Sequence, residues 1–161
     1  MTVENLRSRG NVKVKEGGTY RGKFLSANGD VSLPNDTEVE TISAKGDVAL
    51  GQRCHVKLLS ARNLKALDNL YCSTVICHGS VELGEGCSVG SLQATGDIRF
   101  KQGLQSLGWT VFSEKGAIKG EGIVRLGDTD VPADRAFSYG GGSILTALTQ
   151  KEQLELIEGK R

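Results

Sequence analysis

Cysteine and histidine are the residue types in this chain that could bind a metal or carry out redox chemistry. They occur as Cys54-His55, Cys72, Cys77-His78 and Cys87. No CxxC pair is present, and the intervals match no standard zinc pattern. Cys54 and Cys87 fall two repeats apart, about 9.6 Å, whereas a disulfide needs Cα atoms within about 7 Å. We therefore expect buried, reduced thiols, and neither a metal nor a cofactor.

The two histidines raise the question of catalysis. Acyltransferases built on left-handed β-helices place a histidine between coils, but their hexapeptide repeats carry an aliphatic residue at every sixth position. This chain lacks that pattern. Alternation beside inward-facing cysteines places His55 and His78 on the surface. An acyltransferase-like enzyme is therefore the least favoured alternative, and we predict a non-enzyme with no catalytic residues.

Aspartates that follow glycines could form a row of carboxylates for calcium. These are Asp30, Asp47 and Asp97. The nonapeptide pattern GGxGxDxUx, which would supply further oxygen ligands, is absent. An aspartate at a Gly-Asp corner usually accepts a hydrogen bond from a nearby backbone N–H, and we predict that structural role. The glycine run 140–142 lacks the Gly-Lys-Ser/Thr of a phosphate loop, so we interpret it as part of a linker.

The aspartates belong to a repeat that organises most of the chain. The motif Gly-(Asp/Asn/Ser)-(Val/Ile)-x-(Leu/Val/Phe) begins at Gly10, Gly29, Gly46, Gly79 and Gly96. Two of the steps are 17 residues long, and a gap of 33 residues leaves room for a degenerate copy near Asn63. Such a short period indicates a solenoid, in which each coil buries its apolar face only by stacking on its neighbours.

Within each repeat, apolar and polar residues alternate, which is typical of strands. The prediction is an all-β, single-stranded parallel β-helix of about six to seven coils with a spacing of about 4.8 Å. The apolar positions align in columns, one of which reads Leu33, Leu50, Leu67, Leu83 and Phe100. The coil near Asn63 is one residue short, and we expect a local bulge there that points Leu64 inward and Lys65 outward.

Three segments follow from this pattern. Residues 1–126 are expected to form the parallel β-helix. Residues 127–142 contain Pro132 and three consecutive glycines, and are interpreted as a linker. Ser143 is a suitable N-cap, so a helix is predicted over residues 143–159, either capping its own solenoid or associating with another chain.

Composition excludes some classes of function. The chain has 20 basic and 19 acidic residues, a net charge of +1, so there is no electrostatic reason to expect nucleic acid or an anionic membrane as the main partner. No run approaches the roughly 18 apolar residues of a membrane span, and the N-terminus lacks the apolar core of a signal peptide. We expect a cytoplasmic protein whose membrane association, if any, is peripheral.

The repeats that carry Gly-Asp-Val-x-Leu, with Val-x-x-Ile/Leu-x-Ala in the other half of each coil, resemble the bactofilins, the polymer-forming bacterial cytoskeletal family. The resemblance covers residues 10–100 and extends toward Leu126. It implies a right-handed β-helix, polymerisation through its ends without nucleotide, and a role in cell shape or in localising partner proteins. The form Ser-Ala-x-Gly-Asp-Val at residues 26–31 and 43–48 is also similar to the β-helix of the flagellar assembly protein A family.

Terminal coils of a β-helix present unpaired backbone groups that template another strand unless they are capped. We therefore predict a structural or scaffold protein that forms a homo-oligomer or polymer through its β-helix ends or faces. The alternative is a module of discrete oligomeric state that binds a protein or polysaccharide. The candidate self-association residues are Val12, Val14, Tyr20, Phe24, Trp109, Val111 and Phe112.

Overall fold

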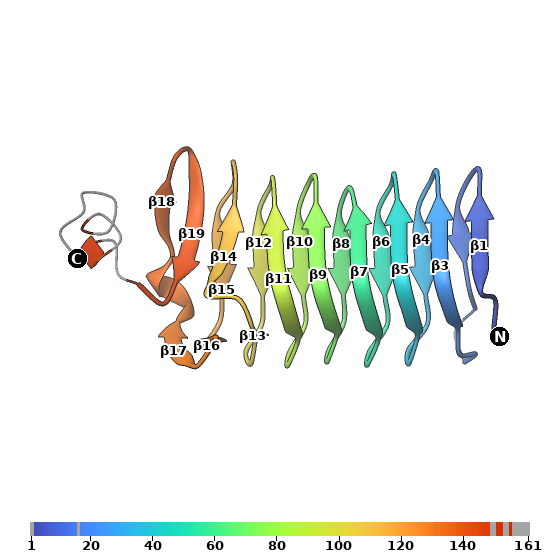
Figure 1. The fold of residues 1–161 in the computed structure, drawn as a ribbon, viewed down its shortest axis with the longest axis horizontal. Helices are drawn as coiled ribbons and strands as arrows, with labels where there is room; N and C mark the ends of the chain where they lie inside the picture. The colour runs from blue at the N-terminus through green and yellow to red at the C-terminus, as the bar shows by residue number, and fades with distance from the viewer. Residues whose placement is uncertain (1, 16, 149–150, 153–154, 156–161) are drawn as a thin grey trace.

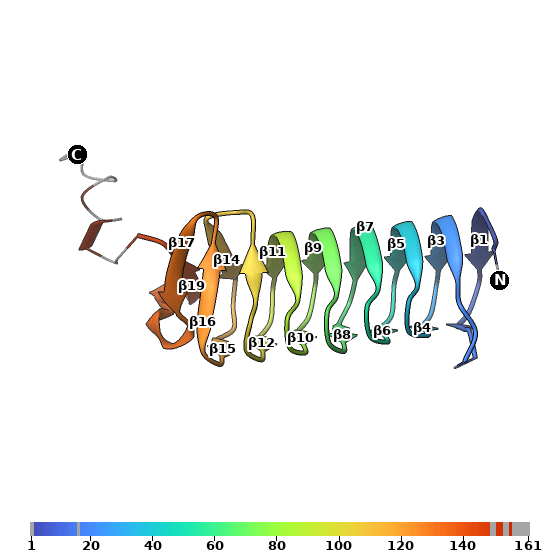
Figure 2. The same cartoon turned by 90° about the horizontal axis from the view of Figure 1, so that it is seen from below.

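The computed structural model describes residues 2–15, 17–148, 151–152 and 155. These residues wind into a parallel β-solenoid of about seven turns, drawn as a rod with β1 at one end and β18 and β19 toward the other (Figures 1 and 2). The prediction of an all-β parallel solenoid is confirmed. Its strands form two sheets that run along the rod.

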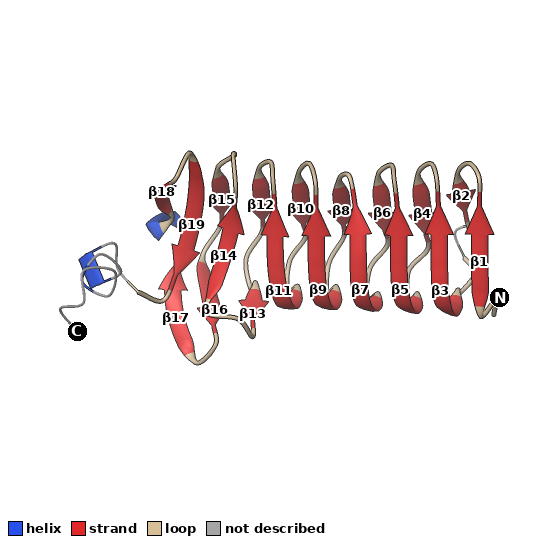
Figure 3. Cartoon of the chain, turned by 45° about the horizontal axis from the view of Figure 1, so that its top comes forward, coloured by secondary structure: helices blue, strands red, loops and turns tan. Residues whose placement is uncertain are grey.

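The larger sheet collects the long strands of the coils and the strands of the C-terminal region (Figure 3). Its members are β1 (Asn5–Ser8), β3 (Arg21–Ala27), β5 (Glu38–Ala44), β7 (His55–Ala61), β9 (Tyr71–Cys77), β11 (Ser88–Ala94), β13 (Gln105–Ser106), β14 (Thr110–Ser113), β16 (Ile123–Leu126), β17 (Thr129–Pro132), β18 (Phe137–Tyr139) and β19 (Gly142–Thr146).

The smaller sheet contains one short strand from each coil, all in parallel register. Its members are β2 (Val12–Lys13), β4 (Val31–Leu33), β6 (Val48–Leu50), β8 (Leu64–Ala66), β10 (Val81–Leu83), β12 (Ile98–Phe100) and β15 (Ile118–Gly120). A single 3-10 turn, η1 (Ala133–Arg135), interrupts the strands near the C-terminal end.

Apolar columns run through the interior because parallel register places equivalent residues of successive coils on top of one another. In β5, the alternation of buried and exposed residues points Val39, Ile42 and Ala44 inward. The column through Ile42 is almost fully buried, and it comprises Leu25, Ile42, Leu59, Val75, Leu92 and Val111. Each coil therefore depends on the coils on either side to cover its core.

Aspartate and asparagine side chains at the corners, several of them in Gly-Asp or Gly-Asn motifs, connect neighbouring coils through hydrogen bonds. The Asp47 N–H donates to Asp30 Oδ1 over 2.8 Å, and the Ser80 N–H donates to Asn63 Oδ1 over 2.7 Å. The same type of hydrogen bond recurs at four other places, where a side-chain Oδ1 accepts from a backbone N–H of the next coil. The acceptor and donor residues are Asn11 and Asp30, Asp97 and Ala117, Asn35 and Gln52, and Asp68 and Glu85. The predicted corner role is confirmed for Asp30 and Asp97, with the accepted N–H coming from the next coil.

Glycine is required at these corners for space. A Cβ atom added to Gly46 would meet Asp30 Oδ1 and would lie 2.8 Å from the Gly29 carbonyl carbon and oxygen. A Cβ atom at Gly79 would likewise meet Asn63 Oδ1 and the Arg62 carbonyl oxygen. The oxygen that accepts the hydrogen bond therefore occupies the volume that a side chain would need.

The degenerate coil differs from the others at one corner. Val48 pairs with Leu64, and Leu64 pairs with Val81, so Asn63 takes the place of the usual aspartate and the preceding glycine is missing. Leu64 is buried and Lys65 is exposed, as expected. The column prediction was wrong at this coil, because Ala66 takes the inward place assigned to Leu67, which is 45% exposed.

The shortened corner also changes the role of Asp47. Its Oδ1 accepts hydrogen bonds from Asn63 Nδ2 over 2.9 Å and from Arg62 Nε over 3.1 Å, rather than from a backbone N–H of the next coil. These two hydrogen bonds hold the pKa of the Asp47 carboxyl below its ordinary value.

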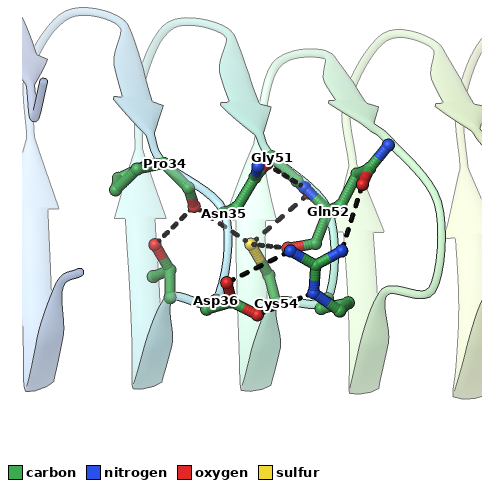
Figure 4. Close-up of polar contacts among 8 residues, drawn as sticks. Pro34, Asn35, Asp36, Gly51, Gln52 and Cys54 are labelled. Atoms are coloured by element: carbon green, nitrogen blue, oxygen red, sulfur yellow. Dashed lines mark hydrogen bonds and ion pairs between the residues drawn. The ribbon is translucent and has the colours of Figure 1, made fainter. Parts of the chain in front are cut away.

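A second corner of each coil uses a left-handed backbone conformation. Asp36, Arg53 and Asn69 have φ values of 61°, 57° and 61° at equivalent positions of successive coils. Arg53 donates to both carboxylate oxygens of Asp36, over 2.8 Å and 3.2 Å, and the hydrogen bonds lower the pKa of that carboxyl. Figure 4 shows this corner, in which the Cys54 thiol donates to the Pro34 carbonyl oxygen over 3.4 Å.

The C-terminal region differs from its sequence prediction. The range 127–142, expected to be a linker, contains β17, η1 and β18, and its glycines form the turns of two hairpins. The helix predicted to begin at Ser143 is wrong at that end, because residues 142–146 form strand β19. Residues 151, 152 and 155 have helical backbone, and the other residues beyond 148 lie outside the described part of the chain.

Strand β19 lacks the alternating sequence pattern of the other strands, and burial explains why. Leu145 faces Val111 in the interior and is 0% exposed, while Ile144 pairs with Phe112 and Phe137 and is 6% exposed. Consecutive apolar residues are buried on both faces of this strand, so the period of two is lost. An apolar run of this kind cannot be distinguished from part of a helix by periodicity alone.

Candidate functional site

The cysteines lie in the core as structural residues. All four are free and buried, as predicted, and Cys72 and Cys77 replace the valine and alanine of their columns. Burial raises the pKa of Cys72 and of Cys77 to about 12, so both thiols stay protonated and unreactive at neutral pH. Among the described residues, no cluster of His, Cys, Asp and Glu could hold a metal ion.

The histidines point outward, as predicted, but they do not form a site together. His55 lies at the start of β7, where its ring is 5.6 Å from the ring of Tyr71 in the next coil. His78 lies exposed at the corner between β9 and β10. The two residues are separated along a coil by the whole length of a long strand and therefore cannot act on one substrate atom.

The N-terminal end of the rod is open. β1 forms the edge of the larger sheet, and β2 forms the edge of the smaller one. Within the described part of the chain, no strand pairs with the outer edge of β1, and Val3, Leu6 and Val14 are only partly buried against the core. This end therefore exposes both apolar core surface and backbone hydrogen-bonding groups.

The backbone groups available at this edge can be assigned. The carbonyl oxygens of Glu4 and Ser8 accept hydrogen bonds from the coil that contains β3. Because backbone groups alternate in direction along a strand, the N–H and C=O groups of Asn5 and Arg7 face the free edge. A strand of another molecule could pair there without disturbing the ladder between β1 and β3.

The C-terminal end is closed by antiparallel strands. β19 pairs with β14, β18 pairs with β19, and β17 pairs with β16. The core residues beneath them are fully covered, since Val124, Leu126, Val131 and Leu145 are each 0% exposed. Arg135 of η1 donates to the carbonyl oxygens of Thr146 and Ala147 over 3.1 Å and 2.9 Å, which ties the end of β19 to the cap.

The structure separates the residues that we proposed for self-association. Tyr20 and Val111 are 0% exposed and Val12 is 9% exposed, so these three pack in the core. Val14 and Phe24 are partly buried near the N-terminal end, where the Arg7 guanidinium lies 5.6 Å from the Phe24 ring.

The C-terminal candidates lie beside the cap. Trp109 is 56% exposed and packs beside Gly127. Phe112 is half-buried in β14, beside β19, and makes an edge-on contact with Tyr139 at 6.4 Å between ring centroids. Antiparallel strands therefore cover much of the surface that would have met another rod.

Sequence reasoning missed the residues that line the open edge, Asn5, Leu6 and Arg7. They precede the first recognisable glycine motif and therefore carry no repeat signal. Their alternation of exposed and partly buried residues is the period of a strand. These residues fall within the predicted β-helix, but that weak pattern did not mark them as its exposed edge.

The Tyr20 hydroxyl is unusual among the described groups because it is buried without a hydrogen-bond partner. Burial raises the pKa of Tyr20 above its ordinary value, so the phenol stays neutral. A buried hydroxyl without a partner costs about 1–3 kcal/mol. The Tyr20 ring therefore fills the core at the start of its column, and its hydroxyl adds no favourable hydrogen bond to the folded state.

We predict that Tyr20→Phe leaves the free energy of unfolding unchanged or raises it by up to about 1 kcal/mol, because the ring stays and the hydroxyl is removed. Urea denaturation followed by circular dichroism measures the free energy of unfolding of the variant and of the unmodified chain. Tyr20→Leu, which shortens the plug, should lower stability. A loss of more than about 1 kcal/mol in Tyr20→Phe would show that the hydroxyl has a partner in solution.

No protein-family model, no curated protein and no solved structure matches this chain. The resemblance to bactofilins therefore stays a prediction from the repeat. No helix in the described residues has the length and apolar character needed to cross a membrane.

Proposed function

We propose that this protein is a non-enzymatic scaffold that self-associates through the open N-terminal end of its β-solenoid. The observation that supports this most directly is the difference between the two ends. Val3, Leu6 and Val14 lie partly exposed beside the unpaired edge of β1, whereas antiparallel strands cover the core at the other end and leave Leu107, Trp109 and Ile123 exposed on its surface. Association at the N-terminal end would bury this apolar surface and pair the free edge of β1.

The geometry favours a closed dimer over the open filament that the bactofilin resemblance implies. With the core covered at the C-terminal end, each rod offers one open end, and two such ends can pair their β1 edges by a two-fold rotation that satisfies both. The proposed assembly is thus a pair of rods joined at their N-terminal ends. A monomeric binding module is the second candidate, favoured by the same capped end.

Asn5→Pro tests the proposal. It removes an N–H that faces the free edge and leaves the bonds between β1 and β3 in place. We expect the fold and melting temperature to change little while the dimer dissociates, so that the dissociation constant rises by about tenfold or more, since several edge hydrogen bonds lose their alignment. Light scattering after size-exclusion chromatography measures the mass.

Asn5→Ala is the matched control, because it changes the same side chain and keeps the N–H. We expect it to dimerise like the unmodified chain. If Asn5→Pro folds and still dimerises with unchanged affinity, the edge of β1 is not the interface and the proposal fails.

A further inference from the structure

The outer face of the smaller sheet carries an excess of positive charge. Register aligns its outward side chains in one column along the rod, and four of the seven are cationic while one is acidic. The column reads Lys13, Ser32, Ala49, Lys65, Glu82, Arg99 and Lys119. This excess exceeds the net charge of +1 of the whole chain, so the positive charge is concentrated on this face.

A hollow of about 940 Å³ opens in this face where the column has small side chains. Ser32 and Ala49 form part of its floor, and Lys13 and Lys65 stand at its two ends, three strand spacings or about 14 Å apart. Lys15 also lines it. The described lining contains no acidic residue.

The cations of the hollow differ from five other cations in the first half of the rod. Arg21, Lys23, Arg53, Lys57 and Arg62 each pair with a carboxylate. No ion pair among the described residues involves the three lysines of the hollow. Their charges remain available to an anionic ligand.

The irregular coil adds an apolar contact to this hollow. Because the coil is one residue short, Leu67 falls at the corner position that glycine holds in Gly51 and Gly84, and it is 45% exposed. Leu67 lines the hollow together with Val14, Leu33 and Pro34. The surface is therefore cationic at its ends and apolar along one wall.

From this arrangement we propose that the hollow binds an extended protein segment that carries both acidic and apolar side chains. Lysine positions about 14 Å apart along the sheet match carboxylates about four residues apart on an extended chain, which rises about 3.3 Å per residue. Leu67 would contact an apolar side chain between those carboxylates. The lining contains no aromatic residue on which bases could stack, which disfavours single-stranded nucleic acid.

This inference rests on the proposed scaffold role in one respect, that the occupant is a protein segment. The hollow extends along the side of the rod but shares Val14 with the open end, so the two proposals are tested with separate variants. The test of this inference reports peptide binding and the test of the proposed function reports mass, so the failure of one is distinguishable from the failure of the other.

Selection from a library of displayed random peptides on the immobilised chain tests the proposal. We expect the enriched peptides to contain Asp or Glu together with apolar residues. In fluorescence anisotropy, the double variant Lys13→Glu/Lys65→Glu should weaken binding of the selected peptide by about tenfold or more, and Leu67→Ala by about threefold. Binding should weaken as salt is raised.

Lys45→Glu/Lys101→Glu is the control, since it makes the same charge change at two exposed lysines that do not line the hollow. It should bind the selected peptide within about twofold of the unmodified chain.

If circular dichroism shows that the double glutamate variant does not fold, Lys13→Gln/Lys65→Gln replaces it, and we expect this variant also to weaken peptide binding. No enrichment, enrichment without acidic residues, or equal binding by the folded variant overturns the proposal. Tighter binding of a single-stranded oligonucleotide or of phosphatidylserine vesicles than of the selected peptide also overturns it.

Discussion

Leu59→Ala is expected to lower the free energy of unfolding by about 2–5 kcal/mol, the range for leucine-to-alanine changes in a packed core. Leu59 is 0% exposed and stacks between Ile42 and Val75 of the neighbouring coils. The truncation leaves a cavity in the middle of a column, where rigid strands on both sides limit its collapse. Chemical denaturation followed by circular dichroism measures the loss.

The adjacent residue provides a matched control. Leu58 belongs to the same strand but is 41% exposed, because successive side chains of a strand point to opposite faces. Leu58→Ala should change stability by less than about 1 kcal/mol. Equal losses in the two variants would mean that the inward and outward faces of the long strands have been assigned incorrectly.

Gly46→Ala should destabilise the protein by about 1–3 kcal/mol, which is the usual effect of adding atoms to a fully packed position. The new methyl group would meet Asp30 Oδ1 and the backbone of Gly29 in the preceding coil. The chain must then separate the two coils or break the hydrogen bond from the Asp47 N–H to Asp30. Thermal unfolding of the variant should show a clearly lower midpoint.

Gly10→Ala is the control for this effect, because it starts the same motif in the first coil. No heavy atom lies within 4 Å of the position its Cβ would take. We expect its unfolding midpoint to stay close to that of the unmodified chain. A large loss at Gly10 as well would show that backbone conformation, and not space between coils, selects glycine in the motif.

The architecture could be predicted from sequence because each coil of the solenoid repeats the same local structure. A residue such as Val48 or Ile98 occurs at a fixed distance from a glycine, and parallel register turns that sequence spacing into a spatial column. The aspartate corners could be predicted for the same reason. The repeat did not indicate which N–H donates to Asp30. The donor is the Asp47 N–H, which belongs to the next coil.

Positions where the repeat changes length were predicted less well. Loss of one residue before Leu64 shifts everything after it, and Leu67 moves from the inward column to the surface. Two registers were compatible with the sequence there, since Ala66 and Leu67 are both apolar. Hydrogen bonding between neighbouring coils decides between them, with the Leu67 N–H donating to the Leu50 carbonyl oxygen.

The ends of the rod could not be predicted from the repeat, because end residues meet neighbours that the repeat does not contain. Tyr20 was expected at an exposed contact surface and instead fills the core. Ser143 was interpreted as a helix cap and instead pairs with Ser113 in an antiparallel ladder. Such pairings depend on contacts between distant segments, which local propensity and periodicity do not encode.

The central claim is that one end of the solenoid is open and the other is closed. Sedimentation equilibrium across a wide concentration range, with electron microscopy of the same samples, tests it most directly. The account predicts a reversible step from one 17.1 kDa chain to two, and short particles without filaments. A chain that stays monomeric at every concentration, or one that grows into filaments, would contradict it.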